Sequence, residues 1–96
     1  MNRVLLSATI LERQATRYTP AGVPAVDLSL GHESQLSEAG QVRQVRLELK
    51  AVGLGEMAKR LETLPLGHSA QFAGFLSAQR NGKGLKLHIT DFDTEA

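Results

Sequence analysis

Hydrophobic and polar residues alternate along several stretches of the chain, which is the pattern of a β-strand with one buried face. The first stretch runs from Arg3 to Arg13, where additional apolar residues indicate a strand that is apolar on both sides. The second runs from Val23 to Gly31. Between them lies Thr19-Pro20-Ala21-Gly22, and because proline and glycine suit the conformations of a β-turn, it predicts a hairpin that joins the two strands.

The middle of the chain changes its pattern twice. Residues 32–40 are polar without a usable period, so we expect a loop there. The clearest alternation follows, between Val42 and Val52, and predicts a third strand with one exposed, charged face. From Leu54 to Leu64 the apolar residues recur at helical spacing, and Pro65 interrupts that spacing. We therefore expect one short amphipathic helix after the third strand.

Two further strands are expected in the last third of the chain. Alternation returns from His68 to Gln79, and Gly74 in the middle of this stretch indicates a bulge or a sharp bend. The tetrapeptide Asn81-Gly82-Lys83-Gly84 is typical of a hairpin turn. Alternation resumes from Leu85 to Thr90 and predicts a fifth strand.

Five strands with one short helix between the third and the fourth is the element order of an all-β OB-fold, a five-stranded Greek-key barrel that often binds oligonucleotides or oligosaccharides. An SH3-like barrel or a generic α+β sheet would give a similar pattern. The 96 residues suffice for a single domain, residues 1–96, and are too few for two cores. With three Phe, one Tyr and no Trp, the core is expected to rest on Leu, Val, Ala and Ile.

Composition excludes several classes of function. The chain has no Cys, so we expect neither disulfides nor thiolate metal sites, and the cytoplasm is the default location. His32, His68 and His88 have no companions at the spacing of a metal motif, so we expect no metal, no cofactor and no catalytic residue. The short, broken apolar stretch at the N-terminus predicts neither a signal peptide nor a membrane span. We expect a binding protein rather than an enzyme.

The formal net charge of +1 does not by itself indicate a nucleic-acid-binding protein, so the distribution of charge has to decide. Basic residues gather in the predicted third strand and around the last hairpin, where acids are scarce. The two groups are Arg43, Arg46 and Lys50, and Arg80, Lys83 and Lys86. An OB barrel is expected to bring both groups to one side. On the charge pattern alone, however, a solvated face is the preferred interpretation.

Several motifs resemble those of a known family. A resemblance to the first hairpin of bacterial single-stranded DNA-binding proteins is carried by Arg17-Tyr18-Thr19-Pro20-x-Gly22, a hydrophobic pair and then Leu28-Ser29-Leu30. A small primosomal branch of that family is similar at Ser37-Glu38-Ala39-Gly40, at Arg43-Gln44 and from Asn81-Gly82 to Leu87-His88. The resemblance covers nearly the whole chain.

This resemblance implies an OB-fold accessory protein of the replication-restart primosome. The implied partners are single-stranded DNA, a replication-restart helicase (PriA-like) that it recruits or stimulates, other primosome proteins, and a second copy in a homodimer. The residues expected to contact DNA, mainly through charge, are Arg17, Tyr18, Arg43, Arg46, Lys50, Arg80, Lys83 and Lys86. Where this family commonly carries aromatic residues on the third strand, the chain has Gln41 and Arg46. The alternative is therefore a protein-interaction OB module of the primosome with little intrinsic affinity for DNA.

Overall fold

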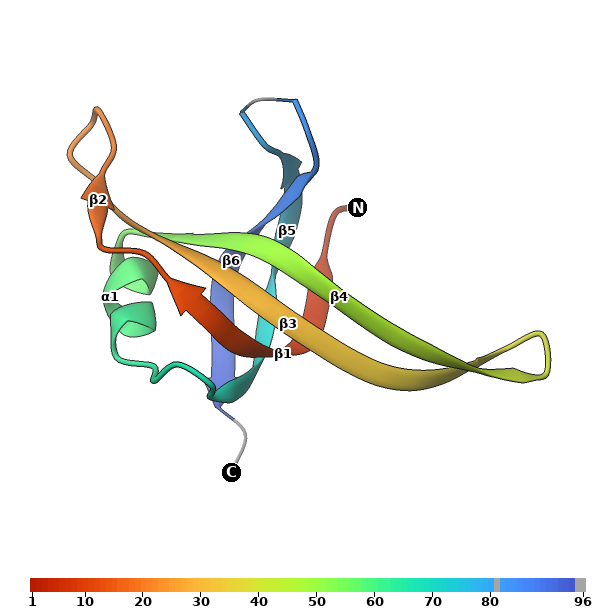
Figure 1. Ribbon diagram of the computed structural model, residues 1–96. Helices are drawn as coiled ribbons and strands as arrows, with labels where there is room; N and C mark the ends of the chain where they lie inside the picture. The colour runs from red at the N-terminus through yellow and green to blue at the C-terminus, as the bar shows by residue number, and fades with distance from the viewer. Residues whose placement is uncertain (81, 95–96) are drawn as a thin grey trace.

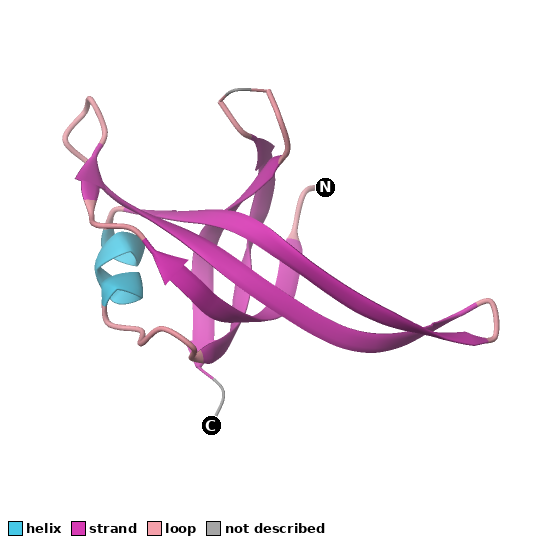
Figure 2. Ribbon diagram, viewed as in Figure 1, coloured by secondary structure: helices cyan, strands magenta, loops and turns pink. Residues whose placement is uncertain are grey.

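The computed structural model describes residues 1–80 and 82–94, which form one strongly curved sheet and one short helix (Figures 1 and 2). The elements in chain order are β1 (Val4–Arg13), β2 (Arg17–Tyr18), β3 (Pro24–Glu38), β4 (Gln41–Leu54), α1 (Glu56–Glu62), β5 (Ser69–Ala78) and β6 (Leu85–Thr94). Within these residues no helix has the length and apolar character needed to cross a bilayer. In the predicted turn at 81–84, Asn81 lies outside the described residues.

The sheet closes into a barrel because β1 pairs with two different strands. Residues 4–9 pair with β5 and residues 9–13 pair with β3, so that Thr9 has a partner on both sides. From β5 the order continues through β6 and β4 to β3, with β4 and β6 parallel and the neighbouring pairs antiparallel. The two-residue β2 lies beside β3. This closed barrel of five long strands, with its helix between β4 and β5, confirms the predicted OB-fold.

Side chains that point into the barrel form its hydrophobic core. The largest fully buried ones are Phe72, Ile10, Leu30, Leu61, Leu87 and Val26. Aliphatic residues dominate, as predicted, although Phe72 is the largest member. The helix α1 buries Met57 and Leu61 against the barrel. Arg13 of β1 donates hydrogen bonds to the carbonyls of Leu61 and Leu64 at the end of α1, and so provides partners that the last turn of a helix lacks.

The prediction of a loop at residues 32–40 is wrong, because β3 continues as a strand to Glu38. With β4 it forms a long hairpin that projects from the barrel (Figure 1), and residues 32–47 are called the arm below. A two-residue turn closes the hairpin, with a φ of 51° at Ala39 and 75° at Gly40. Most side chains of the arm are exposed on both faces. Burial therefore imposes no alternation on the β3 half of the arm, residues 32–38.

Gly74 lies at an irregularity of β5, as its position in the predicted strand indicated. The register between β5 and β6 shifts between Ala73 and Gly74. A methyl group at Gly74 would lie 1.9 Å from the carbonyl oxygen of His88. The backbones of the two strands are thus too close at this point for any side chain, and glycine is required there.

Candidate nucleic-acid interface

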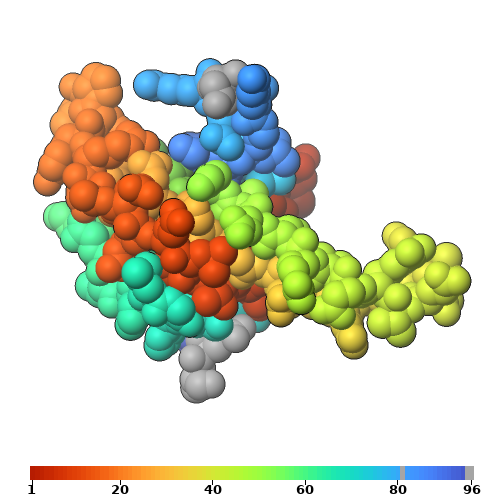
Figure 3. Space-filling model, in the orientation of Figure 1, coloured from red at the N-terminus to blue at the C-terminus, as the bar shows by residue number. Residues whose placement is uncertain are grey.

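Two loops rise on either side of the outer face of the barrel (Figure 1). One joins β2 to β3 at residues 19–23, and the other joins β5 to β6. Between them lies an open groove of about 810 Å³, lined by residues from β2, β3, β4, β5 and β6. Figure 3 shows the hollow between the orange loop and the blue loop. OB-folds as a class bind oligonucleotides between these two loops and on the strands below them.

Four cationic side chains line the groove, and each comes from a different part of the chain. They are Arg17 of β2, Lys50 of β4, Arg80 of the loop after β5, and Lys86 of β6. The parallel pairing of β4 with β6 makes Lys50 and Lys86 direct neighbours. Asp27 is the single carboxylate that lines the groove among the described residues. The groove is therefore strongly positive although the whole chain is nearly neutral.

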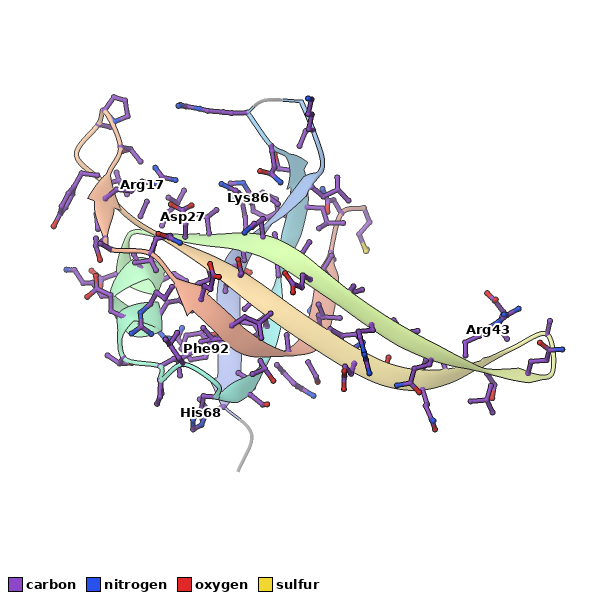
Figure 4. All side chains as sticks on the ribbon, in the orientation of Figure 1. Arg17, Asp27, Arg43, His68, Lys86 and Phe92 are labelled. Carbon is purple, nitrogen blue, oxygen red and sulfur yellow. The ribbon has the colours of Figure 1, made fainter. Side chains whose placement is uncertain are left out.

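Asp27 contacts two of these cations (Figure 4). Its carboxylate accepts hydrogen bonds from Arg17 Nε at 2.6 Å and Arg17 Nη2 at 3.1 Å, and Lys86 Nζ lies 3.5 Å away. The hydrogen bond from Arg17 is the main cause that lowers the pKa of Asp27 below its ordinary 3.8, against the opposing effect of partial burial. The same bond raises the pKa of Arg17. Arg17 and Asp27 are consequently both charged at neutral pH.

Lys50 is held by a neutral partner. Its ammonium donates a hydrogen bond of 2.8 Å to the hydroxyl of Ser29, which is the residue paired with it across β3 and β4. A hydroxyl fixes the position of the ammonium without cancelling its charge. Lys50 is thereby presented along the floor of the groove as a full positive charge.

The predicted residues of the arm lie apart from the groove. Arg46 lies on the face that continues from Lys50, whereas Arg43 lies on the opposite face, because odd and even positions of a strand alternate. Both arginines form ion pairs across the hairpin, Arg46 with Glu33 at 2.8 Å and Arg43 with Glu38 at 3.4 Å. The expectation that both basic groups share one side therefore does not hold for Arg43.

The last hairpin also differs from its sequence expectation. Lys86 lies within the groove, Arg80 lies on its wall, and Lys83 is exposed in the loop between them. The expectation that acids are scarce around this hairpin does not hold for Lys86. Asp27, 59 positions earlier in the chain, is brought next to it by the β3–β4–β6 pairing.

Two aromatic surfaces accompany the cations. Tyr18, next to Arg17 on β2, is 69% exposed, and it is not among the residues that line the groove. Phe75 of β5 and His88 of β6 are cross-strand partners whose rings stack with centroids 4.8 Å apart and planes 7° apart. His88 lines the groove, and Phe75 is 41% exposed.

The stacked pair is absent from the contacts predicted from the sequence, although a signal was present. Phe75 falls between the apolar positions of the alternating stretch 68–79, at a place that the pattern assigns to solvent. A large aromatic residue on a solvent face is a sign of a binding surface.

Within the described ranges, 1–80 and 82–94, no group of three His, Cys, Asp or Glu side chains is placed to hold a metal ion. The groove offers positive charge, a few hydroxyl groups and aromatic faces. Such a set of groups suits a flexible polyanion with flat rings.

The chain matches a known family along almost its whole length. The family model described as "another single-strand binding protein family" matches residues 2–91. The replication restart protein PriB of Bordetella pertussis is 48% identical over 90 residues, which cover 93% of this chain and 84% of that protein.

Solved structures agree with the sequence comparison. The protein PriB from Ralstonia solanacearum superposes with a TM-score of 0.91 at 40% identity, and the match covers 100% of this chain and 99% of that one. The single-stranded DNA binding protein from Thermus aquaticus superposes with a TM-score of 0.78 at 27% identity. That match covers 100% of this chain and 50% of the Thermus chain.

Proposed function

Because this chain belongs to the single-strand binding protein family and, within it, to the PriB replication restart proteins, we propose that it binds single-stranded DNA in the groove during replication restart. Membership of that family confirms the resemblance seen in the sequence motifs. The observation that carries the proposal is the convergence of Arg17, Lys50, Arg80 and Lys86 on one groove. A flexible strand that lies between the two loops can place successive phosphates beside these cations.

Bases are held by exposed aromatic side chains near the groove, of which His88 lines the groove itself. Stacking of one base on an aromatic side chain contributes roughly 1–3 kcal/mol and tolerates any sequence. Tyr18 and the Phe75–His88 pair supply such faces in place of the aromatic residues that the third predicted strand lacks. Binding is therefore expected to show little sequence preference.

Charge accounts for most of the affinity. If the four groove cations each neutralise one phosphate, log K for a single strand falls against log salt with a slope of roughly −2 to −3. A duplex is expected to be a poorer ligand, because its paired and stacked bases are not free to stack on aromatic side chains. A salt-independent affinity or a preference for duplex would contradict this mode of binding.

Fluorescence anisotropy with labelled oligo-dT at several salt concentrations tests the proposal. Replacing Arg80, Lys83 and Lys86 together by Ala is expected to weaken binding and to flatten the salt slope by about 1.5, because two of the four groove cations are lost. Arg46→Ala, on the arm, is expected to have a smaller effect. Lys59→Ala on α1 removes a positive charge away from the groove and serves as the control, with unchanged affinity. Circular dichroism shows whether each variant is folded.

A second candidate function is a protein-interaction module of the primosome with little affinity for DNA. It is favoured by the ion pairs that occupy Arg43 and Arg46, and by the exposed apolar side chains Leu36 and Val42 on the arm. In this case the purified replication-restart helicase binds the chain, while oligo-dT does not bind even at low salt. Recruitment of the helicase is compatible with both candidates, and either role belongs in the cytoplasm.

We also propose that two copies associate through β1. Within the described residues, residues 4–8 of β1 pair with β5 and with no second strand, although the ring of His32 contacts the carbonyl of Ser7 at 2.6 Å. Leu5 and Leu11 are exposed apolar residues on this strand. A second copy that packs along this strand would cover these exposed apolar side chains.

A further inference from the structure

Asp27 lies at the centre of the positive charge in the groove (Figure 4). It is carried by β3, and it contacts Arg17 of β2 and Lys86 of β6 at once. Its side chain keeps 25% of its surface exposed, so the carboxylate is at the surface of the groove and not underneath it. A negative charge in this place needs an explanation if the groove binds a polyanion.

The contact with Arg17 uses the edge of the guanidinium that is suited to phosphate. Nε and Nη2 form a fork that holds two oxygens of one carboxylate or phosphate together. Asp27 occupies this fork, with Arg17 Nε 2.6 Å from Oδ2 and Arg17 Nη2 3.1 Å from Oδ1. A phosphate that binds Arg17 in the same way has to take the place of the carboxylate.

We propose that Asp27 is a built-in competitor of the DNA phosphates. It holds Arg17, and more weakly Lys86, until a DNA phosphate displaces it. Asp27 thereby sets how tightly the groove binds DNA. This inference rests on the DNA-binding function proposed above and adds the residue that limits its affinity. Repulsion acts in the same direction, because contacts inside the groove are shorter than the Debye length of about 8 Å at physiological salt, so salt screens them incompletely.

The contrasting role for Asp27 is that of a positioning residue, which orients Arg17 toward the phosphates. The two roles predict opposite signs for the removal of the charge. A competitor weakens binding, so its replacement raises the affinity. A positioning residue strengthens binding, so its replacement lowers the affinity. Asp27 occupies the Nε and Nη2 edge of Arg17, so a phosphate that uses this edge has to displace the carboxylate, whereas one that uses only the Nη1 end would not.

The test compares the native chain with Asp27→Asn in anisotropy titrations of labelled oligo-dT over a series of NaCl concentrations. Asp27→Asn is expected to bind oligo-dT about tenfold more tightly at low salt. The slope of log K against log salt should be steeper by about 0.7 for each groove cation that Asp27 no longer neutralises. Asp93→Asn is the control, since it removes the same charge near the other end of β6, where β6 pairs with the start of β5. We expect a change of less than about twofold for this control. Adding Arg17→Ala to Asp27→Asn should abolish most of the gain.

Each outcome bears on the competitor role of Asp27, on the DNA-binding function, or on both. If the native chain binds and Asp27→Asn binds equally or more weakly, the competitor role is overturned and the DNA-binding function stands. If Asp93→Asn gains as much as Asp27→Asn, net charge is responsible and the competitor role is again overturned. If neither the native chain nor Asp27→Asn binds at low salt, both proposals fail. If Asp27→Asn alone binds, the competitor role is supported. Thermal melting checks folding, and Asp27→Ser replaces the Asn variant if that variant does not fold.

Discussion

Replacing Gly74 by Ala should destabilise the barrel severely, because the added methyl group meets backbone. An ideal Cβ at Gly74 lies 1.9 Å from the carbonyl oxygen of His88 and 2.8 Å from its carbonyl carbon, whereas ordinary contacts begin near 3.4 Å. The strands β5 and β6 would have to separate by more than about 1 Å. β6 cannot move freely, because it also pairs with β4 to close the barrel.

The expected loss of stability depends on which atoms an added methyl group would meet at each glycine. Overpacking a core usually costs about 1–3 kcal/mol, and we expect at least about 3 kcal/mol for Gly74→Ala, where only backbone can yield. At Gly53 the obstacle is Leu61 Cδ1 at 2.3 Å, a fully buried side chain with little room to move, so we expect about 1–3 kcal/mol. At Gly31 the added Cβ would lie 3.0 Å from the end of the Leu11 side chain. Leu11 is 43% exposed, so its side chain can rotate away. That substitution should cost less than about 1 kcal/mol.

Urea unfolding followed by circular dichroism, at one fixed protein concentration, measures the three free energies of unfolding. The fixed concentration matters if the chain dimerises, since association adds to the apparent stability. Gly31→Ala is the matched control, because it makes the same chemical change in another strand of the barrel. A Gly74→Ala variant within about 0.5 kcal/mol of this control, or a reversed order of the three, would refute the reasoning from contact distances.

Three further outcomes are expected. Leu61→Ala should lower the free energy of unfolding by about 2–4 kcal/mol, while Leu66→Ala, 58% exposed, should lower it by less than about 0.5 kcal/mol in the same urea titration. Because the pKa of Asp27 is lowered in the folded chain, its stabilising effect is complete above its unfolded pKa and is lost as the pH falls through the folded value. Stability measured from pH 6 to pH 2 should therefore fall less steeply for Asp27→Asn than for the native chain. Sedimentation equilibrium should give about twice the protomer mass of 10.4 kDa, and a mass near 10.4 kDa at micromolar concentration would exclude the homodimer.

Most of the barrel could be predicted from the sequence because burial dictates its pattern. The strands that enclose the core alternate, and the apolar stripe of α1 recurs at helical spacing, so each element carries the period of its own geometry. Residues 32–40 show the limit of this signal. Cross-strand pairs such as Glu33 with Arg46 stabilise the arm, and in its β3 half, residues 32–38, they leave no hydrophobic period.

The candidate site could be predicted only in part, because it depends on which strands become neighbours. Lys50 and Lys86 were recognisable as cations in the sequence, but their contact needs the parallel pairing of β4 and β6. Asp27 could not be recognised as part of the site, since it lies 10 positions from Arg17 and 59 from Lys86. Phe75 was detectable from its position in an alternating strand, whereas its stacking on His88 required the register of β5 and β6.

The parallel pairing of β4 and β6 has a thermodynamic consequence for the binding of single-stranded DNA. This seam has three residue pairs, and the first of them sets Lys50 beside Lys86. Like charges that face each other across strands weaken the pairing, and Asp27, 3.5 Å from Lys86 Nζ, offsets only part of this repulsion. A phosphate seated between the two ammonium groups offsets that repulsion, and part of the binding free energy then stabilises closure. DNA binding and local opening of the β4–β6 pairing are linked in this way. The backbone amides of residues 50–52 and 86–88 should therefore exchange with solvent more slowly once DNA is bound.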